Sequence, residues 1–129
     1  MTSKTNDHPA WTAPYLARLG VDDPRSLGAP SLDTLRRLHR AHVERIAFEN
    51  LDIQLGRPQG IGPAESIARI LAGRGGYCFN LNNAFRELLT VLGYEVTVHR
   101  GQINGSAATA KATADEYSTH MALTVVIDG

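Results

Sequence analysis

Cysteine, net charge and long apolar runs are all scarce in this sequence. Because there is a single cysteine, the chain cannot form an internal disulfide, and a reducing, cytoplasmic setting is expected. Thirteen basic residues balance thirteen acidic ones, so no excess charge would attract nucleic acid or an anionic membrane. No apolar run is long enough to span a bilayer, and the start MTSKTNDHPA is too polar for a signal peptide. We therefore expect neither nucleic-acid nor membrane partners.

The composition that remains is that of an ordinary globular domain. Hydrophobic residues make up 43% of the 129 residues, which is enough to bury a core. Residues 1–10 are predicted to be a disordered tail. Beyond this tail, four helices are predicted before residue 93, over residues 12–19, 32–46, 63–72 and 78–92.

The ends of these helices carry recognisable signals. Thr12 and Ser31 are predicted N-caps, Pro63 suits a first helical turn, and Gly73 and Gly93 suit helix ends. The predicted inward-facing residues are Tyr15, Leu16 and Leu19; Leu32, Leu35, Leu38, Val43 and Ile46; Ile67, Ile70 and Leu71; and Leu81, Phe85, Leu88, Leu89 and Leu92.

The pattern changes to β-structure after residue 93. Residues 94–99 alternate between apolar and polar, and residues 119–127 form a second β-like segment behind a polar loop over 104–118. The stretch 47–62 reads as irregular chain with a short extended piece. Helices followed by strands predict an α+β fold, with a helical domain over residues 1–93 and the first strands of a second domain over residues 94–129.

Cys78 is the first candidate for chemistry. It lies in the first turn of a predicted helix, where unpaired backbone N–H groups and the helix dipole favour a thiolate. Gly75 and Gly76 permit a positive φ or a close approach by a substrate, and Arg74 adds positive charge. The alternative is that Cys78 packs in the core with the apolar residues of its helix, and the spacing does not separate the two interpretations.

A cysteine nucleophile needs a base, usually a histidine brought close by the fold. His8 lies in the tail, and His99 alternates away from the apolar face of its strand. His120 opens the last strand among small neighbours, which leaves an imidazole room for a partner, although a surface position is the alternative. His39 and His42 are three residues apart on a helix face that reads as solvated, and without further ligands we predict no metal site.

Four segments of the chain form a distinctive set: YLARLG (15–20), LRRLHRAHVERIAFENLDIQLGR (35–57), RGGYCFNLNNAF (74–85) and THMALTVVIDG (119–129). The most specific feature is the RGG-aromatic-Cys-Phe motif preceded by FENLD. Together the segments resemble the arylamine N-acetyltransferase family. The resemblance implies a fold related to papain-like cysteine enzymes, with a helical bundle, a β-barrel and an α/β lid.

The same resemblance implies the chemistry. Cys78 would accept the acetyl group and His120 would be its base, in a ping-pong reaction between acetyl-CoA and an arylamine or arylhydrazine, with no tightly bound cofactor. Glu49 and Arg74 match positions that pair near the active site, and Arg18 is a candidate third member.

Two further positions are compared with the family. Phe48 matches an aromatic position beside the acceptor pocket. Asn80 departs from the Glu or Gln of relatives, which is expected to alter the hydrogen bonds around the helix start.

Relatives in this family are more than twice as long. Their catalytic triad consists of the cysteine, the histidine and an aspartate, and the aspartate lies on the strand after the histidine. Asp128 lies eight residues along the strand from His120, roughly 26 Å away, so it cannot take that role. Asp128-Gly129 is instead a hairpin signal. We expect an N-terminal fragment that lacks the rest of the barrel and the lid, transfers acetyl groups poorly, and self-associates through an open strand edge. The alternatives are an inactive binding or assembly fragment and another papain-like cysteine enzyme.

Overall fold

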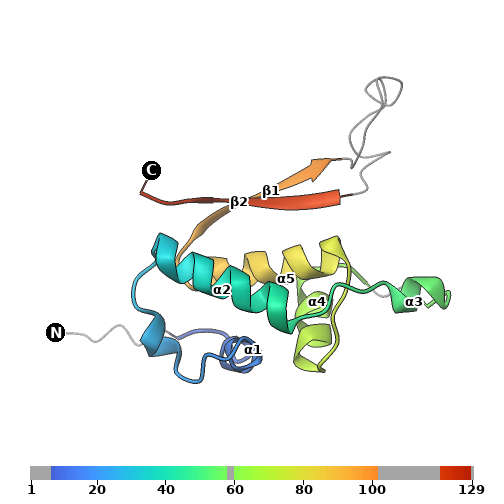
Figure 1. The fold of residues 1–129 in the computed structure, drawn as a ribbon, viewed down its shortest axis with the longest axis horizontal. Coiled ribbons are helices and arrows are strands. Elements are labelled where there is room, and N and C mark those ends of the chain that lie inside the picture. The colour runs from blue at the N-terminus through green and yellow to red at the C-terminus, as the bar shows by residue number, and fades with distance from the viewer. Residues whose placement is uncertain (1–6, 58–59, 102–119, 129) are drawn as a thin grey trace.

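The computed structural model describes residues 7–57, 60–101 and 120–128 (Figure 1). The predicted loop over 104–118, residue 119 and most of the predicted tail lie outside these ranges. A short 3-10 helix covers Pro24–Leu27. The helices are α1 (Thr12–Arg18), α2 (Leu32–Arg45), α3 (Leu51–Gln54), α4 (Pro63–Leu71) and α5 (Cys78–Val91), and the strands are β1 (Glu95–Gly101) and β2 (His120–Val126).

The predicted α+β class is confirmed, because the described residues form five α-helices and a two-stranded sheet. The sheet lies along one side of the layer that contains α2 and α5, and α1 lies on the other side (Figure 1). The division into domains 1–93 and 94–129 stays a prediction. Among the described residues, no helix is both long enough and apolar enough to cross a membrane.

The predicted start signals at Ser31 and Pro63 are confirmed. Ser31 Oγ accepts a hydrogen bond from the Thr34 N–H at 3.1 Å, and Pro63 is the first residue of α4. The N-cap prediction for Thr12 is wrong. Thr12 is already helical and only 1% exposed, because its side chain packs inward, and its Oγ1 finds no hydrogen-bond partner among the described residues.

Helix α5 runs through the middle of the core. Its residues Ala84, Leu88 and Leu89 are fully buried, as are Tyr15 and Leu16 of α1. Fully buried aliphatic side chains are each worth about 1.5–3 kcal/mol, so this cluster is the main source of stability for the helical layer. The orientation of the helix axis of α5 is therefore fixed from several sides.

The inward face of α2 differs from the prediction. Val43 is 67% exposed and Leu32 is 42% exposed, whereas His42, predicted to be solvated, is 6% exposed. Because one residue along a helix turns the side chain by about 100°, an inward face that runs from Leu38 to His42 leaves Val43 outside. Leu71, predicted to be buried, is likewise 37% exposed at the end of α4.

The two strands pair antiparallel, from Glu95 opposite Val126 to Gly101 opposite His120. The predicted alternation is confirmed, because residues 96, 98, 121, 123 and 125 are less exposed than their neighbours. The apolar face of the sheet packs against the helical core through residues that include Val96, Leu123 and Val125. This packing holds the start of β2, and with it His120, against the helical layer.

Candidate active site

The start of α5 places Cys78 at the first helical position. Tyr77 is the N-cap, with extended backbone (φ −96°, ψ −174°) and no side-chain cap, so the sulfur of Cys78 lies at the positive end of the α5 dipole. Cys78 is 6% exposed. The pKa of Tyr77 lies above its ordinary value, mainly because the side chain is partly buried and secondly because of electrostatic repulsion by Cys78. The helix-start position is confirmed, and burial is consistent with both interpretations of the cysteine.

The two glycines before Tyr77 hold the loop against a neighbouring extended segment. The Gly76 N–H donates to the Ala47 carbonyl at 3.2 Å, and the Glu49 N–H donates to the Gly76 carbonyl at 2.8 Å. Phe48 and Gly76 form a parallel bridge, which confirms the predicted extended piece. Neither Gly75 nor Gly76 has a positive φ. Gly75 is required because a Cβ there would overlap the Ala47 carbonyl oxygen.

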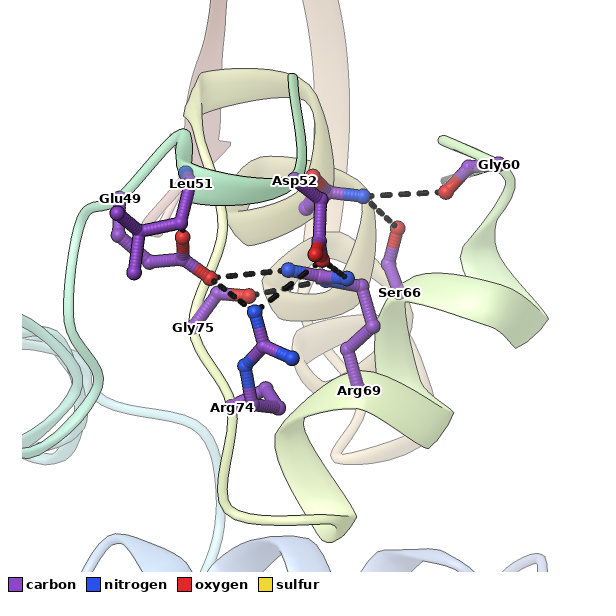
Figure 2. Close-up of polar contacts among 9 residues, drawn as sticks. Glu49, Leu51, Asp52, Gly60, Ser66, Arg69, Arg74 and Gly75 are labelled. Carbon is purple, nitrogen blue, oxygen red and sulfur yellow. Dashed lines mark hydrogen bonds and ion pairs between the residues drawn. The ribbon is translucent and has the colours of Figure 1, made fainter. Parts of the chain in front are cut away.

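A group of four charged residues, here the ionic cluster, lies beside this loop: Glu49, Asp52, Arg69 and Arg74 (Figure 2). The predicted pair of Glu49 and Arg74 is confirmed at 3.4 Å. Arg69 makes the shorter contacts, at 2.9 Å to Glu49 Oε1 and 2.8 Å to Asp52 Oδ2. A hydrogen bond from Arg69 is the main reason why the pKa of Asp52 lies below its ordinary value.

The sequence prediction missed Arg69 and Asp52, and it also missed the short helix α3 that presents Asp52. The available signal was the cluster of acidic residues in FENLD, which needs cations beyond Arg74 once it is partly buried. The prediction for Arg18 is not supported. Its Nε donates to the Ile70 carbonyl at 3.0 Å, a contact that joins α1 to α4 rather than to the ionic cluster.

Phe48 is 70% exposed and lies directly beside the loop that precedes Cys78. Asn80, in the first turn of α5, is 4% exposed. Its Nδ2 donates to the Gly60 carbonyl at 3.2 Å and to Ser66 Oγ at 3.3 Å. Asn80 therefore ties the start of α5 to α4 and to the segment before it.

His120 is the first residue of β2 and is half-buried. The carbonyl of the next residue, Met121, accepts a hydrogen bond from Asn82 Nδ2 at 2.6 Å. Asn82 lies four residues after Cys78, so the two side chains share one face of α5, with Cβ atoms about 5–6 Å apart. One side-chain hydrogen bond therefore connects the strand end at His120 with the helix face that carries Cys78.

A groove of about 480 Å³ opens beside His120, between β2 and helices α2 and α5. Cys78 is not part of its lining. The groove is mostly apolar and could hold part of a small aromatic or aliphatic ligand. Its lining residues are Leu32, Leu35, Arg36, His39, Asn82, Phe85, Leu89, His120, Met121, Ala122, Leu123, Val125 and Ile127.

The remaining histidines do not form a metal site within the described ranges, where no group of three or more potential ligand residues is found. The ring centroids of His42 and Phe85 are 4.6 Å apart. The Tyr15 hydroxyl lies 2.7 Å from Nε2 of His42. His99 forms an exposed hydrogen bond with Thr124 Oγ1 at 2.8 Å.

Comparisons with known proteins identify the family of the chain. The family model described as N-acetyltransferase matches residues 31–129. The chain is 41% identical over 90 residues to an arylamine N-acetyltransferase / N-hydroxyarylamine O-acetyltransferase of Salmonella typhimurium, covering 69% of this chain and 31% of that protein. It is 36% identical over 118 residues to an arylamine N-acetyltransferase of Mycolicibacterium smegmatis, covering 89% of this chain and 41% of that protein.

A solved structure of the arylamine N-acetyltransferase from Salmonella typhimurium superposes with a TM-score of 0.77 at 34% identity, covering 93% of this chain and 42% of that one. The chain thus spans less than half the length of these relatives. The family match over most of the chain, the shared fold and a cysteine at the start of α5 lead to one conclusion: the chain belongs to the arylamine N-acetyltransferase family.

Proposed function

We propose that this chain supplies the acetyl-accepting cysteine and its base in an acetyl-CoA-dependent arylamine N-acetyltransferase. The observation that carries the proposal is the connection between Cys78 and His120. Cys78 begins α5, and Asn82 on the same helix face donates to the Met121 carbonyl, one residue from His120. A cysteine nucleophile requires a thiol near a helix N-terminus and a base within reach, and the Asn82 bond brings the strand end that carries His120 to the helix face of Cys78.

The reaction proceeds in two half-reactions. His120 takes the proton of the Cys78 thiol, and the thiolate adds to the thioester carbonyl of acetyl-CoA. The bond between that carbon and the coenzyme A sulfur breaks, and coenzyme A leaves with the proton that His120 returns. The nitrogen of an arylamine or arylhydrazine then attacks the carbonyl carbon of acetyl-Cys78 and gives a proton to His120. The bond between that carbon and the Cys78 sulfur breaks, the amide leaves, and His120 returns the proton to the sulfur, which regenerates the thiol.

We further propose that this chain alone turns over slowly. The ion pairs among the described residues do not include His120. Asp128 lies beyond the other end of β2 and cannot orient the ring. In serine-protease triads, the wrong tautomer of the histidine lowers the rate by about 10⁴. A comparable loss is expected here whenever no carboxylate holds the imidazole of His120.

The first half-reaction is tested with acetyl-CoA and no acceptor. Intact mass spectrometry of the 129-residue chain is expected to detect one acetyl group, absent in Cys78→Ala and much slower to appear in His120→Gln. An acetyl group that persists in Cys78→Ala would contradict the proposal. Absence of acetylation, together with fast labelling of Cys78 by a peptide-based electrophile, would favour another papain-like cysteine enzyme instead.

A further inference from the structure

Arg69 makes contacts in three directions with one guanidinium group. Its Nη2 pairs with Glu49 Oε1 at 2.9 Å, its Nη1 pairs with Asp52 Oδ2 at 2.8 Å, and its Nε donates to the Gly75 carbonyl at 3.0 Å. Figure 2 shows the group between the two carboxylates and the loop. Its side chain is 12% exposed. Arg69 thereby joins α4 to the segment before α3 and to the loop that leads into α5.

The bond to Gly75 acts on the backbone directly before Cys78. The Gly75 carbonyl is held by Arg69, and both polar groups of Gly76 are held by the extended segment. Only Tyr77, the N-cap of α5, separates this fixed peptide from Cys78. The direction in which the first turn of α5 presents the sulfur therefore depends on the Gly75–Gly76 peptide, and Arg69 is the one side chain that hydrogen-bonds it among the described contacts.

Arg74 carries the same charge but has a different place in the cluster. Its side chain is 47% exposed, and its contacts to Glu49 and Asp52 are longer, at 3.4 and 3.1 Å. The cavity left between the cluster, Tyr77 and neighbouring side chains is only about 10 Å³, room for at most one water. The planar fork of an arginine at position 69 fits this confined site, and a lysine would not reproduce its three directed bonds.

We propose that Arg69 is a positioning residue for Cys78, acting through the Gly75 carbonyl, and that Arg74 contributes mainly charge. This inference rests on the proposed role of Cys78 as the nucleophile. Its test needs no acetyl donor, however, so failure of the chain to accept acetyl from acetyl-CoA would leave the test intact.

The experiment measures the rate constant for alkylation of Cys78 by iodoacetamide, from about pH 5 to about pH 9, by intact mass. The variants are Arg69→Gln, Arg69→Lys, Arg74→Gln and the double variant Asp52→Asn/Arg69→Gln. Arg74→Gln is the matched control, because it removes the same charge from the cluster but keeps the bond to Gly75. The double variant removes that bond while the cluster stays neutral.

We expect Arg69→Gln to slow alkylation at neutral pH by about tenfold or more and to move the pH profile upward, because the helix start no longer holds the sulfur in place. Arg69→Lys is expected to resemble Arg69→Gln, because a lysine cannot supply the fork. Arg74→Gln is expected to slow alkylation about threefold at most, since the charge of Arg74 is half-exposed and screened by solvent. The double variant is expected to stay slow.

Three results would overturn the proposal. Alkylation at the wild-type rate in the double variant would show that charge balance, rather than the bond to Gly75, governs the sulfur. An effect of Arg74→Gln as large as that of Arg69→Gln would show the same. A wild-type pH profile in Arg69→Lys would also contradict it. Melting curves establish which variants are folded, and the neutral double variant replaces Arg69→Gln if the latter unfolds.

Discussion

The Tyr15 hydroxyl lies 2.7 Å from Nε2 of His42, and both side chains are buried. This hydrogen bond joins α1 to α2 through two residues that are 27 positions apart in the sequence. The pKa of His42 is lowered to about 4, mainly by burial and secondly by the charge of His39. Burial also raises the pKa of Tyr15, so both groups are neutral near pH 7.

Acidification is expected to destabilise the fold through His42. Its pKa in the unfolded chain is about 6.5, so the unfolded state binds the proton first, and stability falls as the pH drops from about 6.5 to about 4. The full loss is on the order of 3 kcal/mol and does not grow further below about pH 4. Urea unfolding across this range measures it. The slope should flatten in His42→Gln, while an equally steep slope would contradict the assignment. His99→Gln, an exposed histidine, serves as control.

Gly75→Ala is expected to destabilise the protein and disturb the loop before Cys78. The added Cβ would overlap the Ala47 carbonyl oxygen, and a backbone atom cannot move aside cheaply. We expect a loss of about 2 kcal/mol in the free energy of unfolding. Gly101→Ala is the control, because nothing lies within 4 Å of the Cβ it would add. Equal stability of the two variants would show that the close approach is not required.

Asn82→Ala is expected to slow acetylation of Cys78 about tenfold, because the bond to the Met121 carbonyl holds the strand end that carries His120. Asn83→Ala is the matched control. From the adjacent position of α5, Asn83 donates its hydrogen bond to the Ile61 carbonyl, at 2.7 Å, rather than to a carbonyl of β2. Each variant is expected to lose about 1 kcal/mol of stability. Equal acetylation rates in the two would remove the proposed role of Asn82.

Self-association is expected because the sheet has two strands within the described residues, and the outer edges of these strands offer N–H and C=O groups to a further strand. Val126, near the end of β2, is 44% exposed and adds apolar surface there. Sedimentation velocity over a concentration series should detect dimers or larger species, which Val126→Lys should weaken. A monomer at the highest concentration would rule out this prediction.

Local signals were sufficient for much of the fold. Ser31 and Pro63 start their helices as predicted, because capping and a fixed φ depend on only a few neighbouring residues. The predictions of Thr12 as an N-cap and of His42 as a solvated residue are wrong, because the surroundings of both side chains come from other elements. An inward-facing threonine cannot cap, and a histidine becomes a core residue once a buried tyrosine hydroxyl faces it.

The sequence by itself determined that a lone cysteine would begin a helix, since a helix start depends mainly on a few neighbouring residues. It also carried the family motif around Cys78. Only the tertiary structure decided which cation holds the loop. Arg69 hydrogen-bonds Glu49, which is 20 residues away in the sequence, and Gly75, which is 6 residues away. Asn82 hydrogen-bonds Met121, which is 39 residues away. These contacts depend on how helices and strands pack, which no short stretch of sequence encodes.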